Sequence, residues 1–259
     1  MLYDAAAIAR TCPAGIEQTE WAARLELAAC YRVFEHRGWV EEIFNHITVR
    51  VPGPQRHYLI NPFGLNYGEI TARNLVKVDA RGEVVGRSDH PVNRAGFVIH
   101  SAIHAARDDA HCVIHTHHTA GLAVACKEGG LAMDNFYAAF LDGRIAYHDF
   151  EGLTVHEGEQ QRLVQNLGAK PVLILRNHGL LVADHDVPTA FYWMYVLQRA
   201  CEVQVMADSM AGANRALTRE AREVSSRDMA LTDPQGALYQ KVFEAAVRRA
   251  KVTLEALAA

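Results

Sequence analysis

Two short stretches decide how this chain folds: 112–117, with the sequence CVIHTH, and 176–179, with the sequence RNHG. The first is short, apolar and rich in β-branched residues, which predicts a β-strand. Side chains two residues apart on a strand point to the same face, about 7 Å apart at a rise of roughly 3.4 Å per residue. His115 and His117 can therefore converge on one ion.

A third histidine, His178, follows a second strand-like run at 172–175 and sits in an Asn-His-Gly turn. Three imidazoles make an open metal site, which leaves the remaining coordination positions to water or substrate. The spacing alone is weak support, because the chain contains 14 histidines and most His-x-His pairs are ordinary polar or packed residues. The motifs around both stretches carry the interpretation further.

These motifs resemble the class II aldolase/adducin family, and the likeness is close to the adducin head domain. They follow one another in order from about residue 20 to residue 210, and together they are a strong signal although each is weak by itself. The matching segments are 38–39, 45–48, 62–65, 92–97, 100–103, 115–117, 146–149 and 173–180.

Composition fits a globular protein of the cytoplasm. A chain of 259 residues can form one large α/β domain or two small ones. Its five cysteines are scattered and odd in number, which indicates a reducing compartment. A net charge of −4 without a basic run argues against nucleic acid. The start of the chain lacks the features of a signal peptide, and no segment approaches the ~18 apolar residues of a membrane span.

Hydrophobic periodicity predicts the order of the elements. We expect a loose arm over residues 1–15, a polar and mobile crossover over 213–232, and strand or loop at 136–137 and 145–147. The expected helices cover 17–37, 95–107, 119–127, 157–167 and 188–210, with a last helix capped by 232–234. The expected strands cover 43–51, 57–60, 75–78, 84–85, 112–117 and 172–175.

The family resemblance implies the architecture. It implies one α/β domain over residues 1–259, a three-layer α/β/α class II aldolase fold with a mostly antiparallel central sheet. The core of this domain spans about 17–212, and 213–259 supply a crossover and a C-terminal helix. The resemblance also implies a homotetramer with active sites at the subunit interfaces, each binding a small-molecule substrate.

The resemblance also implies a reaction type. The family metal polarises a carbonyl or enediolate oxygen as a Lewis acid, so His115, His117 and His178 are expected to hold a divalent ion. Zinc is the first choice, with iron, manganese, cobalt or nickel as alternatives. The family aldolases add a glutamate that moves the proton, and here Gly96 stands in its place. We therefore expect lyase-type chemistry on a small hydroxy- or oxo-carbonyl compound, but not cleavage of a sugar phosphate.

Four further residues are candidates for the site. His100 lies one helical turn beyond Gly96 and could replace the missing base, or it could be a packed residue that orients a ligand. Arg94, where the family has a phosphate-binding serine, could hold a carboxylate or phosphate, or be a surface charge. Asn45 matches the asparagine of the family phosphate loop, or forms a structural turn. Tyr137 falls near the proton-donating tyrosine that a neighbouring subunit contributes, after a one-residue shift.

Three functions from different classes fit these residues. The first is the metal-dependent enzyme, the second a non-catalytic oligomeric binding module like the adducin head, and the third a three-histidine iron-dependent oxygenase. The chain ends at Ala259 without the Lys-rich tail of adducin, and it keeps all three histidines. Both observations favour the enzyme.

Overall fold

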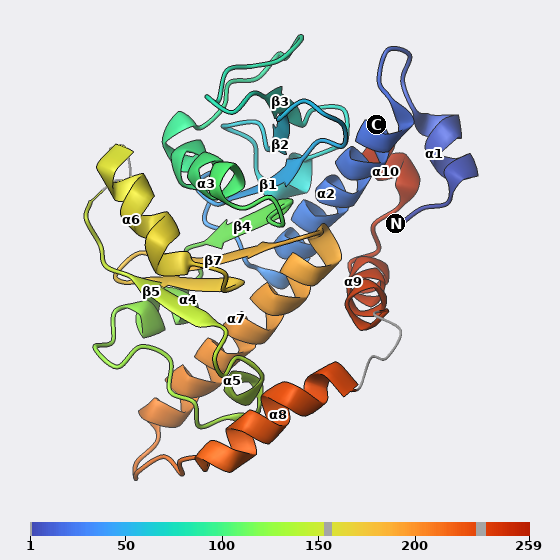
Figure 1. The fold of residues 1–259 in the computed structure, drawn as a ribbon. Helices are drawn as coiled ribbons and strands as arrows, with labels where there is room; N and C mark the ends of the chain where they lie inside the picture. Colours follow the sequence, from blue (N-terminus) through green and yellow to red (C-terminus); the bar gives the residue numbers. More distant parts are fainter. Residues whose placement is uncertain (1, 153–156, 232–236) are drawn as a thin grey trace.

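The computed structural model describes residues 2–152, 157–231 and 237–259 as a central sheet with helices on both faces (Figure 1). The strands are β1 (His46–Arg50), β2 (Tyr58–Ile60), β3 (Val76–Val78), β4 (Cys112–Thr116), β5 (Ile145–His148), β6 (Val172–Leu175) and β7 (Gly179–Asp184). The helices are α1 (Ala5–Thr11), α2 (Gln18–Arg37), the 3-10 turn η1 (Tyr67–Glu69), α3 (Arg94–Ala106), α4 (Thr119–Ala125), α5 (Phe136–Phe140), α6 (Glu157–Leu167), α7 (Val187–Ser209), α8 (Arg219–Leu231), α9 (Leu238–Arg249) and α10 (Leu254–Ala258).

The seven strands form one sheet in the order β3-β2-β1-β4-β7-β6-β5. Neighbouring strands are antiparallel except for β5 and β6, which run parallel. The expectation of a mostly antiparallel sheet is thus confirmed. The strand that carries the first histidine lies in the middle of the sheet, and its register pairs His115 with His46 on β1 and with Leu181 on β7.

Side-chain alternation along the central strands builds the three layers. Ile114 of β4 and Val182 of β7 belong to the large core with α2 and α7. Their neighbours Val113 and Leu181 belong to a second core with α3 and α6 on the opposite face. Figure 1 shows α3 and α6 on one side of the sheet and α2 and α7 on the other. The predicted three-layer α/β/α arrangement is confirmed.

Two helix ends follow the predicted sequence signals. Gly38 ends α2 in the left-handed conformation at φ 67°, which a glycine adopts without a Cβ penalty. Asp186 caps α7, and its side chain accepts a hydrogen bond of 2.8 Å from the Thr189 amide. Both helices pack on the central strands, since α2 contacts β1 and α7 contacts β4 and β7.

Three segments differ from expectation because short polar caps create helices there. The first 15 residues are not wholly a loose arm: Asp4 accepts from the Ala7 amide and starts α1. Segment 136–137 is helical, because the Asn135 side chain accepts from two amides at the start of α5. The crossover contains α8, begun by Thr218 and supported by the i,i+4 pair Arg219–Glu223.

Smaller differences concern the hairpin and the C-terminus. The expected strand at 84–85 is only an isolated bridge between Val84 and Val78. The last helix is divided into α9 and α10 around Lys251, whose φ is 55°. The cap predicted at 232–234 lies outside the described residues. All five cysteines are free, and no helix in the described part of the chain is long and apolar enough to cross a membrane.

Candidate metal centre

Strand β4 and the turn between β6 and β7 bring the three predicted histidines together. The ligand nitrogens of His115, His117 and His178 all lie within 4.8 Å of one another. The Nε2 atoms of His115 and His117 are 2.9 Å apart, and the His178 ring stacks on His117 with centroids 5.0 Å apart. The three residues are called the histidine tripod below.

The β6–β7 turn places His178 by a tight backbone path. Asn177 adopts the left-handed conformation at φ 57°, and the His178 amide donates to the Leu175 carbonyl at 3.1 Å. Gly179 comes next, where an added Cβ would meet the Thr116 carbonyl oxygen at 2.4 Å. Glycine therefore allows β7 to approach the end of β4 closely enough for the tripod to form.

Burial keeps the tripod imidazoles neutral. It lowers the pKa of His115 far below its usual value, with the other site histidines adding to the effect. Burial also lowers the pKa of His117, and it lowers the pKa of His178 to about 4, again helped by neighbouring imidazoles. At neutral pH each ring therefore has one nitrogen with a lone pair, the form that binds metal ions.

The hydrogen bonding of His115 shows which nitrogen faces the centre of the tripod. Its Nδ1 lies 2.9 Å from the Leu180 carbonyl oxygen, which can only accept, so Nδ1 carries the proton. The Nε2 lone pair is then directed at His117. The Nε2 atoms of His115 and His117, 2.9 Å apart, are close enough to bind one ion together. The tripod residues fit a divalent metal.

Asn45 supports the tripod through the backbone of His117. Its Oδ1 accepts a hydrogen bond of 3.0 Å from the His117 amide, and its Nδ2 donates to the Trp39 carbonyl at 3.4 Å. Its side chain is 1% exposed. The structure thus shows that Asn45 supports the backbone at His117. Its role in substrate binding stays a prediction.

Behind the tripod lies a buried chain of hydrogen-bonding groups that runs from β1 into α3. His46 Nδ1 lies 2.8 Å from His100 Nε2, and His100 Nδ1 lies 2.7 Å from Thr48 Oγ1. The same hydroxyl lies 2.8 Å from His104 Nε2, and His104 Nδ1 lies 2.7 Å from the Ala110 carbonyl oxygen. Each of the four side chains is at most 4% exposed. This set is called the histidine chain below.

Sequence reasoning singled out His100 but missed His46 and Thr48. Two signals were available: His46 and Thr48 alternate on one face of a strand, and His100 and His104 are one helical turn apart. The sequence pattern does not predict the packing of α3 across β1, and this packing brings the two pairs into contact. His46 is the member nearest the tripod, with its ring centroid 5.2 Å from that of His115.

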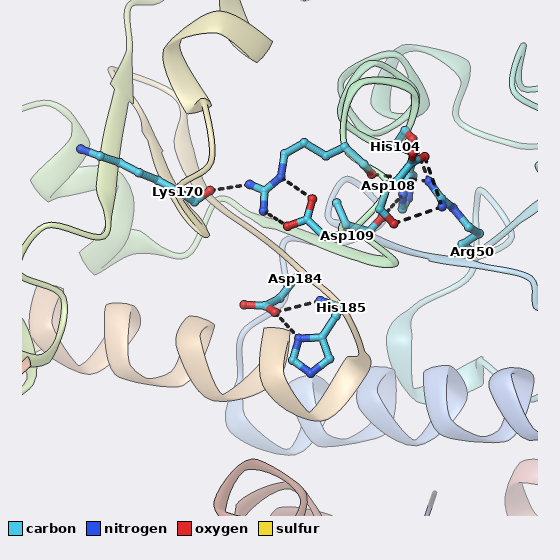
Figure 2. Close-up of polar contacts among 9 residues, drawn as sticks. Arg50, His104, Asp108, Asp109, Lys170, Asp184 and His185 are labelled. Atoms are coloured by element: carbon cyan, nitrogen blue, oxygen red, sulfur yellow. Dashed lines mark hydrogen bonds and ion pairs between the residues drawn. The ribbon is translucent and has the colours of Figure 1, made fainter. Parts of the chain in front are cut away.

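An arginine clamp holds the end of α3 against the sheet (Figure 2). Arg50, the last residue of β1, donates to the His104 carbonyl at 2.8 Å and to the Asp108 carbonyl at 3.3 Å. Arg107 pairs with Asp109 at 2.5 Å and donates to the Lys170 carbonyl at 2.6 Å. Because these bonds tie α3 to β1 and to the loop before β6, they fix the position of the histidine chain.

The remaining candidates lie in different places. Gly96 is at the start of α3 against His46, and the side chain of Arg94 lies outside the described residues. His118 precedes α4, and its side chain contacts Gln198 of α7. Tyr137 lies on α5, with its ring centroid 6.2 Å from that of Tyr195. No contact within the described part of this single chain joins Tyr137 to the tripod.

Comparisons with known proteins identify the family. The model of the class II aldolase and adducin N-terminal domain matches residues 25–205. Alpha-adducin of Rattus norvegicus is 47% identical over 199 residues, a match that covers 76% of this chain and 27% of adducin.

Two solved structures carry the same fold. An aldolase II superfamily protein from Pseudomonas syringae is 40% identical with a TM-score of 0.85, covering 91% of this chain and 94% of that one. An L-fuculose 1-phosphate aldolase from Glaciozyma antarctica is 29% identical with a TM-score of 0.77, covering 95% and 99%. The chain belongs to the class II aldolase and adducin N-terminal domain family.

Proposed function

We propose that this protein is a metal-dependent enzyme that performs lyase-type chemistry on a small hydroxy- or oxo-carbonyl compound. The observation that carries the proposal is the tripod of His115, His117 and His178, whose nitrogens lie within 4.8 Å of one another. Neutral imidazoles suit zinc first, and iron, manganese, cobalt or nickel as alternatives. A purely structural role would not require three imidazole nitrogens to lie this close together.

The tripod would hold the ion, and a bound divalent ion supplies a Lewis acid for a carbonyl or enediolate oxygen. The other residues would bind substrate or move protons. Asn45 and Arg94 are proposed to contact the substrate, and His100 is proposed to take part in proton transfer through its contact with His46. We propose that the protein is a homotetramer of the cytoplasm. Tyr137 would then act in the site of a neighbouring subunit.

Gly96 directs the proposal away from sugar phosphates. The family aldolases resembled by this chain place a glutamate there, and glycine has no proton-transfer group. The L-fuculose 1-phosphate aldolase of Glaciozyma antarctica shares the fold at 29% identity. One fold can host different reactions, so this likeness does not assign a sugar phosphate as the substrate. Metal-assisted proton abstraction next to a carbonyl would remain available to this chain.

Solvent exchange tests this proposal without knowledge of the substrate. Dihydroxyacetone is a simple hydroxy-carbonyl probe: a carbon-bound proton next to the carbonyl leaves, and a deuteron from D₂O takes its place. We expect protein loaded with Zn²⁺ to accelerate this exchange, followed by proton NMR. The variant His117→Ala should lose the acceleration together with the metal, whereas exposed His185→Ala should keep both. Exchange that is equal in all three proteins would contradict the proposal.

A second function has support of its own. Alpha-adducin is 47% identical to this chain over 199 residues, which cover 27% of adducin. An adducin-head-like binding module would keep the fold and its self-association without turnover. Under this alternative the His117→Ala protein should keep its oligomeric state, measured by sedimentation, and no metal-dependent exchange should appear. Iron in the purified protein together with consumption of O₂ would instead favour the three-histidine oxygenase.

A further inference from the structure

We propose that His46 takes the place of the missing carboxylate at Gly96 and presents a fixed, unprotonated Nε2 beside the tripod as the hydrogen-bond acceptor for a substrate hydroxyl. The hydroxyl-bearing substrate follows from the proposed function, while the orientation of His46 follows from its own contacts. Histidines 100 and 104 and Thr48 are positioning residues in this account.

His46 occupies the space beside Gly96. A Cβ added at Gly96 would lie 2.4 Å from His46 Nε2 and 2.5 Å from its Cδ2. The His46 ring therefore fills the space that a side chain at position 96 would enter. The ring is also close to the tripod, with centroids 5.2 Å apart between His46 and His115.

The hydrogen bonds fix the protons of the histidine chain, beginning at His104. The Ala110 carbonyl can only accept, so His104 Nδ1 donates to it at 2.7 Å. Burial lowers the pKa of His104 to about 3, so the ring is neutral and its Nε2 accepts. The Thr48 hydroxyl must then donate its single proton to His104 Nε2, at 2.8 Å.

The same donor and acceptor rule fixes the remaining protons, from Thr48 to His46. Because Thr48 has used its proton, its oxygen accepts from His100 Nδ1 at 2.7 Å. His100 is also neutral, since burial lowers its pKa well below the usual value. Its Nε2 therefore accepts from His46 Nδ1 at 2.8 Å. In the neutral His46 ring this leaves the lone pair on Nε2.

The Nε2 of His46 has no hydrogen-bond partner among the residues that the structure describes, although the side chain is only 4% exposed. The Nε2 atom itself is not among the buried unpartnered atoms of the described residues, so a ligand or water can still reach its lone pair. A substrate hydroxyl beside the carbonyl would supply the donor. A substrate carboxylate there would face the lone pair, so this position should select hydroxyl groups over anionic ones.

The same contacts revise the place of His100. Both of its ring nitrogens are occupied, one by His46 and the other by Thr48. It is 0% exposed, so a substrate would meet His46 first. In this arrangement His100 acts on the site through the tautomer of His46.

The test reads the tautomer directly. In ¹⁵N-histidine-labelled wild-type protein loaded with Zn²⁺, NMR should show His46, His100 and His104 protonated at Nδ1 and unprotonated at Nε2. Assignments come from single His→Asn variants. The variant Thr48→Val should disturb this state at His100 and His46, and Thr48→Ser should preserve it. A wild-type His46 that is protonated at Nε2 overturns the inference.

Metal content and exchange separate this inference from the proposed function. His46→Asn keeps a donor toward His100 but removes the acceptor at Nε2. It should retain Zn²⁺ at the wild-type level and lose dihydroxyacetone exchange by about 10²-fold. Loss of Zn²⁺ would make His46 a metal ligand and overturn its role as acceptor. A wild-type protein without exchange but with the expected tautomers would instead contradict the proposed function alone.

Discussion

His46 and Gly96 are sterically coupled, because a Cβ at position 96 would lie 2.4 Å from His46 Nε2. Real side chains do not approach so closely, so any larger residue at 96 must displace the imidazole. The displacement would propagate, since His46 is bonded to His100 at 2.8 Å inside a buried chain. Gly96 is therefore the residue that makes room for His46.

This coupling predicts opposite signs for one substitution in two backgrounds. Gly96→Ala should lower the free energy of unfolding by about 1–3 kcal/mol in the wild type through overpacking. In a His46→Ala background only the Asn93 side chain, with Nδ2 at 3.2 Å, stays close, and alanine in a helix should raise the free energy of unfolding by up to about 1 kcal/mol. Urea denaturation measures both values. Gly158→Ala in α6, where a Cβ has only ordinary contact, is the matched control. Equal effects in both backgrounds would disprove the coupling.

Thr48 should be far more sensitive to loss of its hydroxyl than to loss of its methyl group. Thr48→Val leaves nitrogens of His100 and His104 buried without a partner, which should cost about 2–4 kcal/mol of stability. Thr48→Ser keeps the hydroxyl and should cost less than about 1.5 kcal/mol. Thermal or urea unfolding distinguishes them, and similar losses for both variants would argue against the hydrogen-bonded chain.

His104 should make the protein sensitive to acid. Burial is the largest cause that lowers its pKa to about 3, and the charges of Arg50 and His111 add to it. Below the ordinary value of 6.5 the unfolded chain binds a proton that the folded protein does not, so stability present above pH 6.5 is lost as the pH falls toward 3. The slope is about 1.4 kcal/mol per pH unit for each such proton.

Urea unfolding at pH 7, 6, 5 and 4 measures this effect. We expect His104→Gln to reduce the dependence of unfolding free energy on pH by about one proton, whatever its effect at pH 7. Exposed His36→Gln should leave the dependence unchanged. A His104→Gln protein with the wild-type slope would show that His104 is not held neutral.

Retro-aldol cleavage of fuculose or ribulose phosphates should be weak or undetectable with the wild-type protein. Loss of a positioned general base typically costs about 10²–10⁴-fold. Gly96→Glu alone should not restore the activity, because His46 fills the space, and the double variant His46→Ala with Gly96→Glu is the fairer test. A coupled assay for the released aldehyde measures it. Robust wild-type turnover would refute the role assigned to position 96.

Much of the fold could be predicted from local sequence signals. Helices α2 and α7 follow apolar periodicity and clear caps at Gly38 and Asp186, and the central strand β4 is a short apolar run. The tripod residues were also proposed from local patterns, but β4 ends at Thr116, so His115 lies on the strand, His117 directly after it and His178 in a tight turn. These features depend on near neighbours in the chain, which is why a single sequence reveals them.

The rest depended on contacts between distant segments. The histidine chain requires β1 to lie beside β4 and α3 to pack across β1, with His46 and His100 separated by 54 positions. Helices α1 and α5 each depend on a single capping side chain, Asp4 or Asn135. One capping residue is too weak a signal to predict such a short helix from the sequence. The sequence also could not show that Asn45 bonds to the His117 amide.

Gly179 offers a test of how the tripod is assembled. A Cβ there would meet the Thr116 carbonyl oxygen at 2.4 Å, and backbone cannot easily move away. Gly179→Ala should therefore lower stability by about 1–3 kcal/mol and weaken Zn²⁺ binding, because His178 would shift from His115. Calorimetric titration with Zn²⁺ and thermal unfolding check both effects. Unchanged affinity would mean that the close β4–β7 approach does not position the tripod.

The most direct measurement is elemental analysis of the protein purified without added metal and without chelator. The account predicts about one divalent ion per chain in the wild type. It predicts a loss to below about one tenth in His117→Ala and His178→Ala, and no loss in the exposed control His185→Ala. A wild-type protein that contains no metal and takes up none from Zn²⁺ solution, or tripod variants with wild-type metal content, would contradict it.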